Sequence, residues 1–132
     1  MDNKKLIEQA KAAREFASPA LSGFKVGAAL LTKCGKVFTG CNIEDPSGIG
    51  VTNICAERCA VVKAISEGYK DFEKIAVVGG LSQLIFCTPC GACRQYLNSY
   101  NPNIIVICLD DDENIIELPL GKLLPYSFSE TF

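Results

Sequence analysis

The sequence contains no apolar run that approaches the roughly 18 residues of a membrane span. Charged residues interrupt its first ten positions and no apolar h-region follows them, so we expect neither a secretory signal nor a membrane partner. A chain without such segments is expected to stay in the reducing cytoplasm. There its eight cysteines would be thiols or metal ligands rather than disulfides.

An excess of positive charge is also lacking. Lys and Arg total 13 against 15 Asp and Glu, which gives a formal net charge of -2. Binding to nucleic acid requires clusters of Lys and Arg that neutralise phosphates. The charge balance therefore argues against nucleic acid and against an anionic membrane surface as partners.

Linkers, internal repeats and low-complexity tracts are absent as well. A length of 132 residues suits one domain, and we expect residues 1–132 to form a single domain. Hydrophobic residues make up 48% of the chain, enough for a core that needs no disulfide to stabilise it.

Apolar runs alternate with segments of helical periodicity along the chain. Three helices are predicted, at Asn3 to about Ala17, about Cys55 to Glu67, and Pro89 or Cys90 to about Ser99. Strands are predicted at Phe24–Thr32, Val37–Ile43, Ile75–Leu81, Ile104–Leu109 and Ile115–Leu118. A final helical turn is predicted within Pro119–Leu124, followed by the aromatic residues Tyr126, Phe128 and Phe132.

This order of elements predicts an α/β fold, a three-layer α/β/α sandwich around a five-stranded mixed sheet. The first strand is apolar on both alternating faces, which is typical of a strand buried on both sides. The third and fourth strands are joined through a helix and should be parallel. A short acidic turn should make the fifth strand antiparallel to the fourth.

Three cysteines and one glutamate form the most informative pattern. Cys55-Ala56-Glu57 is followed, about thirty residues later, by the pair Cys90 and Cys93. A structural zinc site usually has four protein ligands, whereas a catalytic site keeps three and leaves a position for water. The pattern predicts a catalytic site for one Zn²⁺ held by Cys55, Cys90 and Cys93, with Glu57 beside it to transfer protons.

Both cysteine segments lie at predicted helix starts, where the helix dipole and free N–H groups stabilise a thiolate. Three thiolates leave zinc with a net negative charge, which a neighbouring cation would offset. Arg58 is favoured as this thiolate charge partner, and Arg94 is the other candidate or else forms a structural salt bridge.

Other interpretations of the cysteines remain open at this point. The three could be buried small side chains, or ligands of a structural zinc with a fourth ligand elsewhere. Cys90 and Cys93 could form a redox pair. Cys59 is a possible competing ligand, and Cys87 is expected to lie nearest the site among the remaining cysteines.

Four segments carry a resemblance to a known family. They are Phe24–Leu30 (FKVGAAL), Thr39–Glu44 (TGCNIE), Ile54–Arg58 (ICAER) and Pro89–Gln95 (PCGACRQ). With them the chain resembles the zinc-dependent cytidine deaminases of the small, homotetrameric type, over essentially its whole length. Zinc deaminases share this metal signature and a glutamate that moves protons without binding the metal.

The resemblance implies hydrolysis of cytidine and deoxycytidine to uridine and deoxyuridine with release of ammonia, a reaction of pyrimidine salvage. Zinc-bound hydroxide would attack C4 of the cytosine ring. Glu57 would take the proton of the water, protonate N3 and pass a proton to the leaving ammonia.

The resemblance also implies a set of substrate contacts. Backbone groups around Ala56 and Thr88 would hold the edge of the base, and Phe24 would stack on the base or line its pocket. Asn42 and Glu44 would bind the ribose hydroxyls. Phe128 would close a pocket in a neighbouring subunit of a homotetramer.

Two segments depart from the family pattern. Ala20-Leu21-Ser22 stands where relatives usually have Pro-Tyr-Ser, and Asp45-Pro46-Ser47-Gly48 where they usually have Asn-Ala-Ser-Tyr. Because of these departures, an alternative function is the same deamination reaction on another aminopyrimidine nucleoside such as blasticidin S. A non-catalytic, zinc-stabilised binding module is the alternative from a different class.

Overall fold

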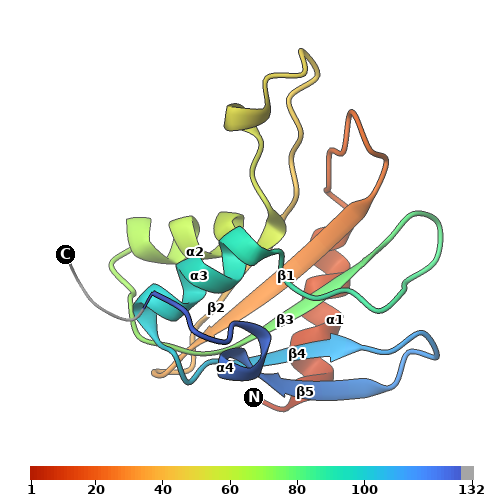
Figure 1. The fold of residues 1–132 in the computed structure, drawn as a ribbon. Coiled ribbons are helices and arrows are strands. Elements are labelled where there is room, and N and C mark those ends of the chain that lie inside the picture. Colours follow the sequence, from red (N-terminus) through yellow and green to blue (C-terminus); the bar gives the residue numbers. More distant parts are fainter. Residues whose placement is uncertain (129–132) are drawn as a thin grey trace.

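A five-stranded mixed sheet organises the fold, with the strands in the order β2-β1-β3-β4-β5 (Figure 1). The structure is a computed structural model that describes residues 1–128; Phe132, the last residue of the predicted aromatic tail, lies outside them. The strands are β1 (Lys25–Thr32), β2 (Val37–Cys41), β3 (Phe72–Gly80), β4 (Ile105–Leu109) and β5 (Ile115–Pro119).

Helices cover both faces of this sheet. They are α1 (Asn3–Arg14), α2 (Ala56–Ser66), α3 (Gly91–Tyr100) and the short α4 (Leu120–Leu123), with a 3₁₀ turn η1 at Gly50–Thr52. Helix α1 packs on one face, while α2 and α3 lie side by side on the other (Figure 1). The predicted three-layer α/β/α sandwich is confirmed.

Strand pairing follows the predicted directions. The two predictions are that β3 is parallel to β4 and that β5 is antiparallel to β4, and both are confirmed. Strand β1 is antiparallel to both β2 and β3. The segment between β2 and α2, which contains η1, projects beyond the sheet at the top of Figure 1.

The core has two halves that meet at strand β1. Ala28 and Leu30 pack with α2 and α3, whereas Ala29 and Leu31 pack with α1. All four side chains are buried, because successive side chains of a strand point to opposite faces and helices cover both faces here. This burial on both faces explains why the sequence of β1 is a continuous apolar run, as expected for a strand covered on both sides.

Two element boundaries differ from the sequence prediction by three residues. Helix α1 ends at Arg14 rather than Ala17, where the Arg14 guanidinium donates hydrogen bonds to the backbone oxygens of Lys25 and Gly80. Strand β3 begins at Phe72 rather than Ile75, because pairing with β1 carries the ladder past two charged residues that interrupt the apolar pattern.

The close approach of α2 to β2 depends on Gly40. A Cβ atom at this position would lie 2.4 Å from the Ala56 carbonyl oxygen and 2.5 Å from the Ala60 nitrogen. Both are backbone atoms of the first turns of α2, so no side chain can rotate to make room. Gly40 therefore sets how closely the start of α2 packs against the sheet.

Replacing Gly40 with Ala is expected to lower the free energy of unfolding by about 2 kcal/mol, the usual cost of overpacking a core. Urea unfolding of the purified protein measures the change. Gly121→Ala is the matched control, because a Cβ there meets no atom within 4 Å. Equal stability of the Gly40→Ala variant and the wild type would contradict the packing argument.

No helix among residues 1–128 combines the length and apolar character needed to cross a membrane.

Candidate metal centre and active site

Two helix starts bring the predicted metal ligands together. Cys55 is the N-cap residue of α2 and Cys90 is the N-cap residue of α3, while Cys93 lies in the first turn of α3. Neither N-cap sulfur forms a capping hydrogen bond with the backbone of its own helix, so both sulfur atoms remain available to a ligand. The two helices lie next to each other on the same face of the sheet, which places their starts side by side (Figure 1).

The three sulfur atoms lie within 4.8 Å of one another, and the Sγ atoms of Cys55 and Cys90 are 3.8 Å apart. A tetrahedral zinc ion with Zn–S distances near 2.3 Å places its sulfur ligands about 3.8 Å apart. The chain contains no histidine, so thiolates are the soft donors that it offers. The donor set and its spacing fit one zinc ion with three protein ligands.

Hydrogen bonds to Cys55 favour its thiolate form. Its pKa falls to about 5, chiefly because the Cys93 side chain hydrogen-bonds to it and also because Arg58 donates to it; partial burial opposes both effects. Arg58 Nη2 lies 3.6 Å from Cys55 Sγ. The contact with Cys55 raises the pKa of Cys93.

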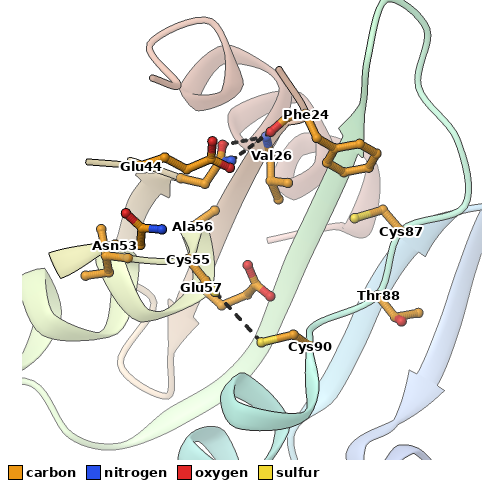
Figure 2. Close-up of a pocket in the computed structure, with 12 residues that line it drawn as sticks. Phe24, Val26, Glu44, Asn53, Cys55, Ala56, Glu57, Cys87, Thr88 and Cys90 are labelled. Atoms are coloured by element: carbon orange, nitrogen blue, oxygen red, sulfur yellow. Dashed lines mark hydrogen bonds between the residues drawn. The ribbon is translucent and has the colours of Figure 1, made fainter. Parts of the chain in front are cut away.

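Glu57 lies in the first turn of α2, next to the sulfur cluster. Glu57 is only 4% exposed, and this burial raises the pKa of its carboxyl group to about 7. Figure 2 shows the carboxyl group among the residues that line a cavity. A carboxyl with this pKa can both take and give a proton near neutral pH.

The cavity beside the sulfur cluster has a volume of about 300 Å³. It is lined by Phe24, Val26, Asn42, Glu44, Asn53, Ile54, Cys55, Ala56, Glu57, Cys87, Thr88 and Cys90 (Figure 2). All five substrate contacts predicted within one subunit belong to this lining. Cys93 joins the sulfur cluster without lining the cavity.

Asn42 and Glu44 already have partners in the chain. The Asn42 amide accepts from the Val26 backbone nitrogen at 2.8 Å and donates to the Phe24 carbonyl at 2.7 Å. The Glu44 carboxylate accepts three hydrogen bonds from the backbone and side chain of Ser22 and the backbone of Leu21. These bonds fix both side chains at the cavity wall and leave each with further hydrogen-bonding capacity.

Arg94 has neither of the two roles predicted for it, partner of the thiolates or member of a salt bridge. Its guanidinium donates to the carbonyl oxygens of Pro89 and Leu123, both at 2.7 Å, and to the Thr88 hydroxyl at 2.9 Å. Within residues 1–128 it forms no salt bridge and no hydrogen bond to a cysteine sulfur. Arg94 instead holds the segment that leads into Cys90 against the end of α4.

Phe128 lies away from the cavity of its own chain. It is 74% exposed, and its backbone oxygen accepts hydrogen bonds from the side chains of Gln95 and Asn98 on α3. These bonds fix the tail along α3 and leave the aromatic ring on the surface.

Of the other cysteines, Cys87 lines the cavity and Cys59 lies outside the sulfur cluster. Burial raises the pKa of Cys87 to about 12, so this thiol stays protonated and neutral.

Three residues of the cavity wall were not predicted from the sequence: Val26, Asn53 and Ile54. Val26 belongs to the same motif as Phe24, and its side chain lies on the same face because it is two residues further along an extended segment. Asn53 and Ile54 directly precede Cys55 and enter the site with it. Asn53 Oδ1 accepts from the Asp45 nitrogen at 2.6 Å, which fixes the projecting segment at its base.

A three-layer α/β fold with three clustered thiols, a buried glutamate and an adjoining cavity defines the class of zinc-dependent enzymes that act on a small molecule. The family model for the cytidine and deoxycytidylate deaminase zinc-binding region matches residues 1–109. The chain belongs to this family.

Relatives in this family cover almost the whole chain. A probable cytidine deaminase from Dictyostelium discoideum is 46% identical over 127 residues, which are 96% of this chain and 84% of that protein. The crystal structure of cytidine deaminase from Burkholderia pseudomallei superimposes with a TM-score of 0.87 at 43% identity and covers 97% of this chain and 100% of that one. A blasticidin-S deaminase from Bacillus cereus is 30% identical over 110 residues, 79% of this chain and 76% of that protein.

Proposed function

We propose that the protein hydrolyses cytidine and deoxycytidine to uridine and deoxyuridine, with release of ammonia. The observation that carries this proposal is a cluster of three cysteine sulfurs beside a cavity that the buried Glu57 carboxyl also lines. The higher identity to the cytidine deaminase relative than to the blasticidin-S deaminase favours cytidine over the antibiotic.

Cys55, Cys90 and Cys93 would hold one zinc ion per chain. When bound, zinc lowers the pKa of a water molecule and makes it a nucleophile at neutral pH. Arg58, which donates to Cys55, offsets the negative charge of the three thiolates.

Glu57 moves the protons of the reaction. Deamination requires that the attacking water lose a proton, that N3 of the ring gain one, and that the amino group leave as ammonia. A single carboxyl with a pKa of about 7 can take a proton from the attacking water and give it to N3. It can then take the remaining proton of the added hydroxyl group and give it to the amino group, which leaves as ammonia as the carbonyl forms. Burial of Glu57 keeps bulk water from competing for these protons.

The remaining cavity residues would position the nucleoside. Phe24 offers a flat apolar surface for the base, and backbone groups at Ala56 and Thr88 can bond to its edge. Asn42 and Glu44 would use their remaining hydrogen-bonding capacity for the ribose hydroxyls. Because Ser22 and Leu21 already bond to Glu44, its carboxylate is fixed before substrate arrives.

A direct assay tests the proposal. Purified zinc-loaded protein is incubated in parallel with cytidine, deoxycytidine and blasticidin S, and ammonia release is measured with the loss of the aminopyrimidine absorbance. We expect rapid turnover of cytidine and deoxycytidine. Turnover of blasticidin S alone would assign another substrate, and no ammonia from any of the three would identify a non-catalytic zinc module.

The protein is further proposed to assemble as a homotetramer. Phe128 at 74% exposure and Val51 at 90% exposure present apolar side chains on the surface of the isolated chain, and contact with neighbouring subunits would bury them. Size-exclusion chromatography with light scattering is expected to give four times the 14.2 kDa chain mass. A particle of a single chain mass would reject the tetramer.

We propose that residues 1–132 form one catalytic domain, which would act in the cytoplasm in pyrimidine salvage. A reducing compartment keeps Cys55, Cys90 and Cys93 as thiols that can bind metal.

A further inference from the structure

Gly79, near the end of strand β3, lies directly beneath the apolar wall of the cavity. A Cβ atom at this position would lie 2.8 Å from Cys87 Sγ, 3.0 Å from Phe24 Cε1 and 3.2 Å from Val26 Cγ2. All three of these side chains line the cavity, and they come from two separate segments of the chain. Glycine inside a strand often marks a place where another group approaches the backbone closely.

The backbone at Gly79 is held from both sides. It pairs with Val26 in the antiparallel ladder between β1 and β3. Its carbonyl oxygen accepts a hydrogen bond from the Ile85 nitrogen at 2.9 Å, within an isolated bridge between Gly79 and Ile85. Strand β3 therefore cannot shift away from an added side chain without breaking pairing on one side or the other.

The side chains above Gly79 would have to move instead. The shortest of the three distances is to Cys87 Sγ, the end of a short side chain that can rotate. A methyl group at position 79 would displace this thiol and press against the Phe24 ring. Figure 2 shows Cys87 and Phe24 next to each other at this wall.

We propose that Gly79 is a positioning residue for nucleoside binding: its missing side chain lets Phe24, Val26 and Cys87 converge into the apolar wall that receives the base. This inference rests on the proposed function for the identity of the ligand. Gly79 itself touches no substrate and acts through the three side chains that lie on it.

Gly79→Ala is expected to raise KM for cytidine by about tenfold with kcat changed by less than about threefold, since a displaced wall weakens binding more than the proton transfers at Glu57. Zinc content should stay at one ion per chain. Gly121→Ala, where an added Cβ meets no atom within 4 Å, is the matched control and should keep the wild-type KM. A wild-type KM in Gly79→Ala overturns the proposal.

The contact with Cys87 is tested by a second substitution. The double variant Gly79→Ala/Cys87→Ala lacks the sulfur atom that the added methyl group would meet first. Its KM for cytidine should therefore be at least about threefold lower than the KM of Gly79→Ala alone. A double variant whose KM equals the product of the two single effects contradicts the contact. If Gly79→Ala alone does not fold, recovery of folded, zinc-loaded protein in the double variant supports the contact, and failure of both variants to fold overturns it.

One further measurement needs no turnover. The rate at which iodoacetamide alkylates Cys87, followed by mass spectrometry of the peptide, is expected to change by at least about threefold in Gly79→Ala, because the thiol is displaced. If the wild-type protein deaminates no nucleoside, the proposed function is wrong, but the alkylation rates still test the contact between Gly79 and Cys87. An unchanged alkylation rate overturns the placement of Cys87 on Gly79 even if cytidine turnover is intact.

Discussion

Replacing Glu57 with Gln is expected to lower kcat for cytidine by about 10³-fold, within the range that general acid–base catalysis contributes. Glutamine has nearly the same shape as glutamate and carries no proton that it can exchange in this reaction. The residue is only 4% exposed and its pKa is raised to about 7, which makes it suited to proton transfer at neutral pH. Steady-state kinetics on cytidine give the change.

The zinc content of the Glu57→Gln variant separates two causes of lost activity. Glu57 is not one of the three clustered metal ligands, so the variant should bind one zinc ion per chain, as the wild type does. Glu67→Gln, at the C-terminal end of the same helix, is the matched control and should keep full activity. Retention of more than about a tenth of the wild-type kcat would exclude Glu57 as the proton carrier.

Replacing Cys55 with Ala should remove bound zinc almost completely and abolish deamination. Two sulfur ligands would remain, and a catalytic zinc site requires three. Cys55 is also the sulfur that accepts a hydrogen bond from Arg58, so its loss removes the contact that offsets the negative charge of the site. Zinc is measured by elemental analysis of the purified protein, and activity is measured with cytidine.

Cys34→Ser is the control for Cys55→Ala, because Cys34 is exposed in the turn between β1 and β2 and lies outside the sulfur cluster. It should retain both zinc and activity. Treating wild-type protein with a chelator should abolish turnover, and adding zinc should restore it. A Cys55→Ala protein with a full complement of zinc would refute the proposed ligand set.

Much of the fold follows from local patterns in the sequence. The apolar run at β1 and the helical periodicity of α1 both predicted elements that the structure contains. The early start of β3 was missed because Glu73 and Lys74 interrupt the apolar pattern after Phe72, and only pairing with β1 draws these residues into the ladder. The end of α1 was missed because Arg14 bonds to strands that lie far from it in the sequence.

The candidate site was predictable where its residues form short motifs. Cys55 and Glu57 are two positions apart, and Cys90 and Cys93 are three apart, so each spacing places both members at one helix start. The role of Arg94 was not predictable, because its partners include a carbonyl oxygen 29 positions further along the chain. The engagement of Asn42 by the backbone of β1 is likewise a contact between segments.

The sequence by itself determined the chemistry that this chain can perform: three thiols, one carboxyl and their local spacing are properties of residue type and helix geometry. Only the tertiary structure decided that two helix starts lie close enough for the sulfurs to come within 4.8 Å of one another. It also decided that Gly79 lies beneath Cys87 and Phe24. The physical reason is that such contacts depend on how helices and strands pack across the sheet. A local sequence pattern carries no information about the distance between two segments that lie far apart in the chain.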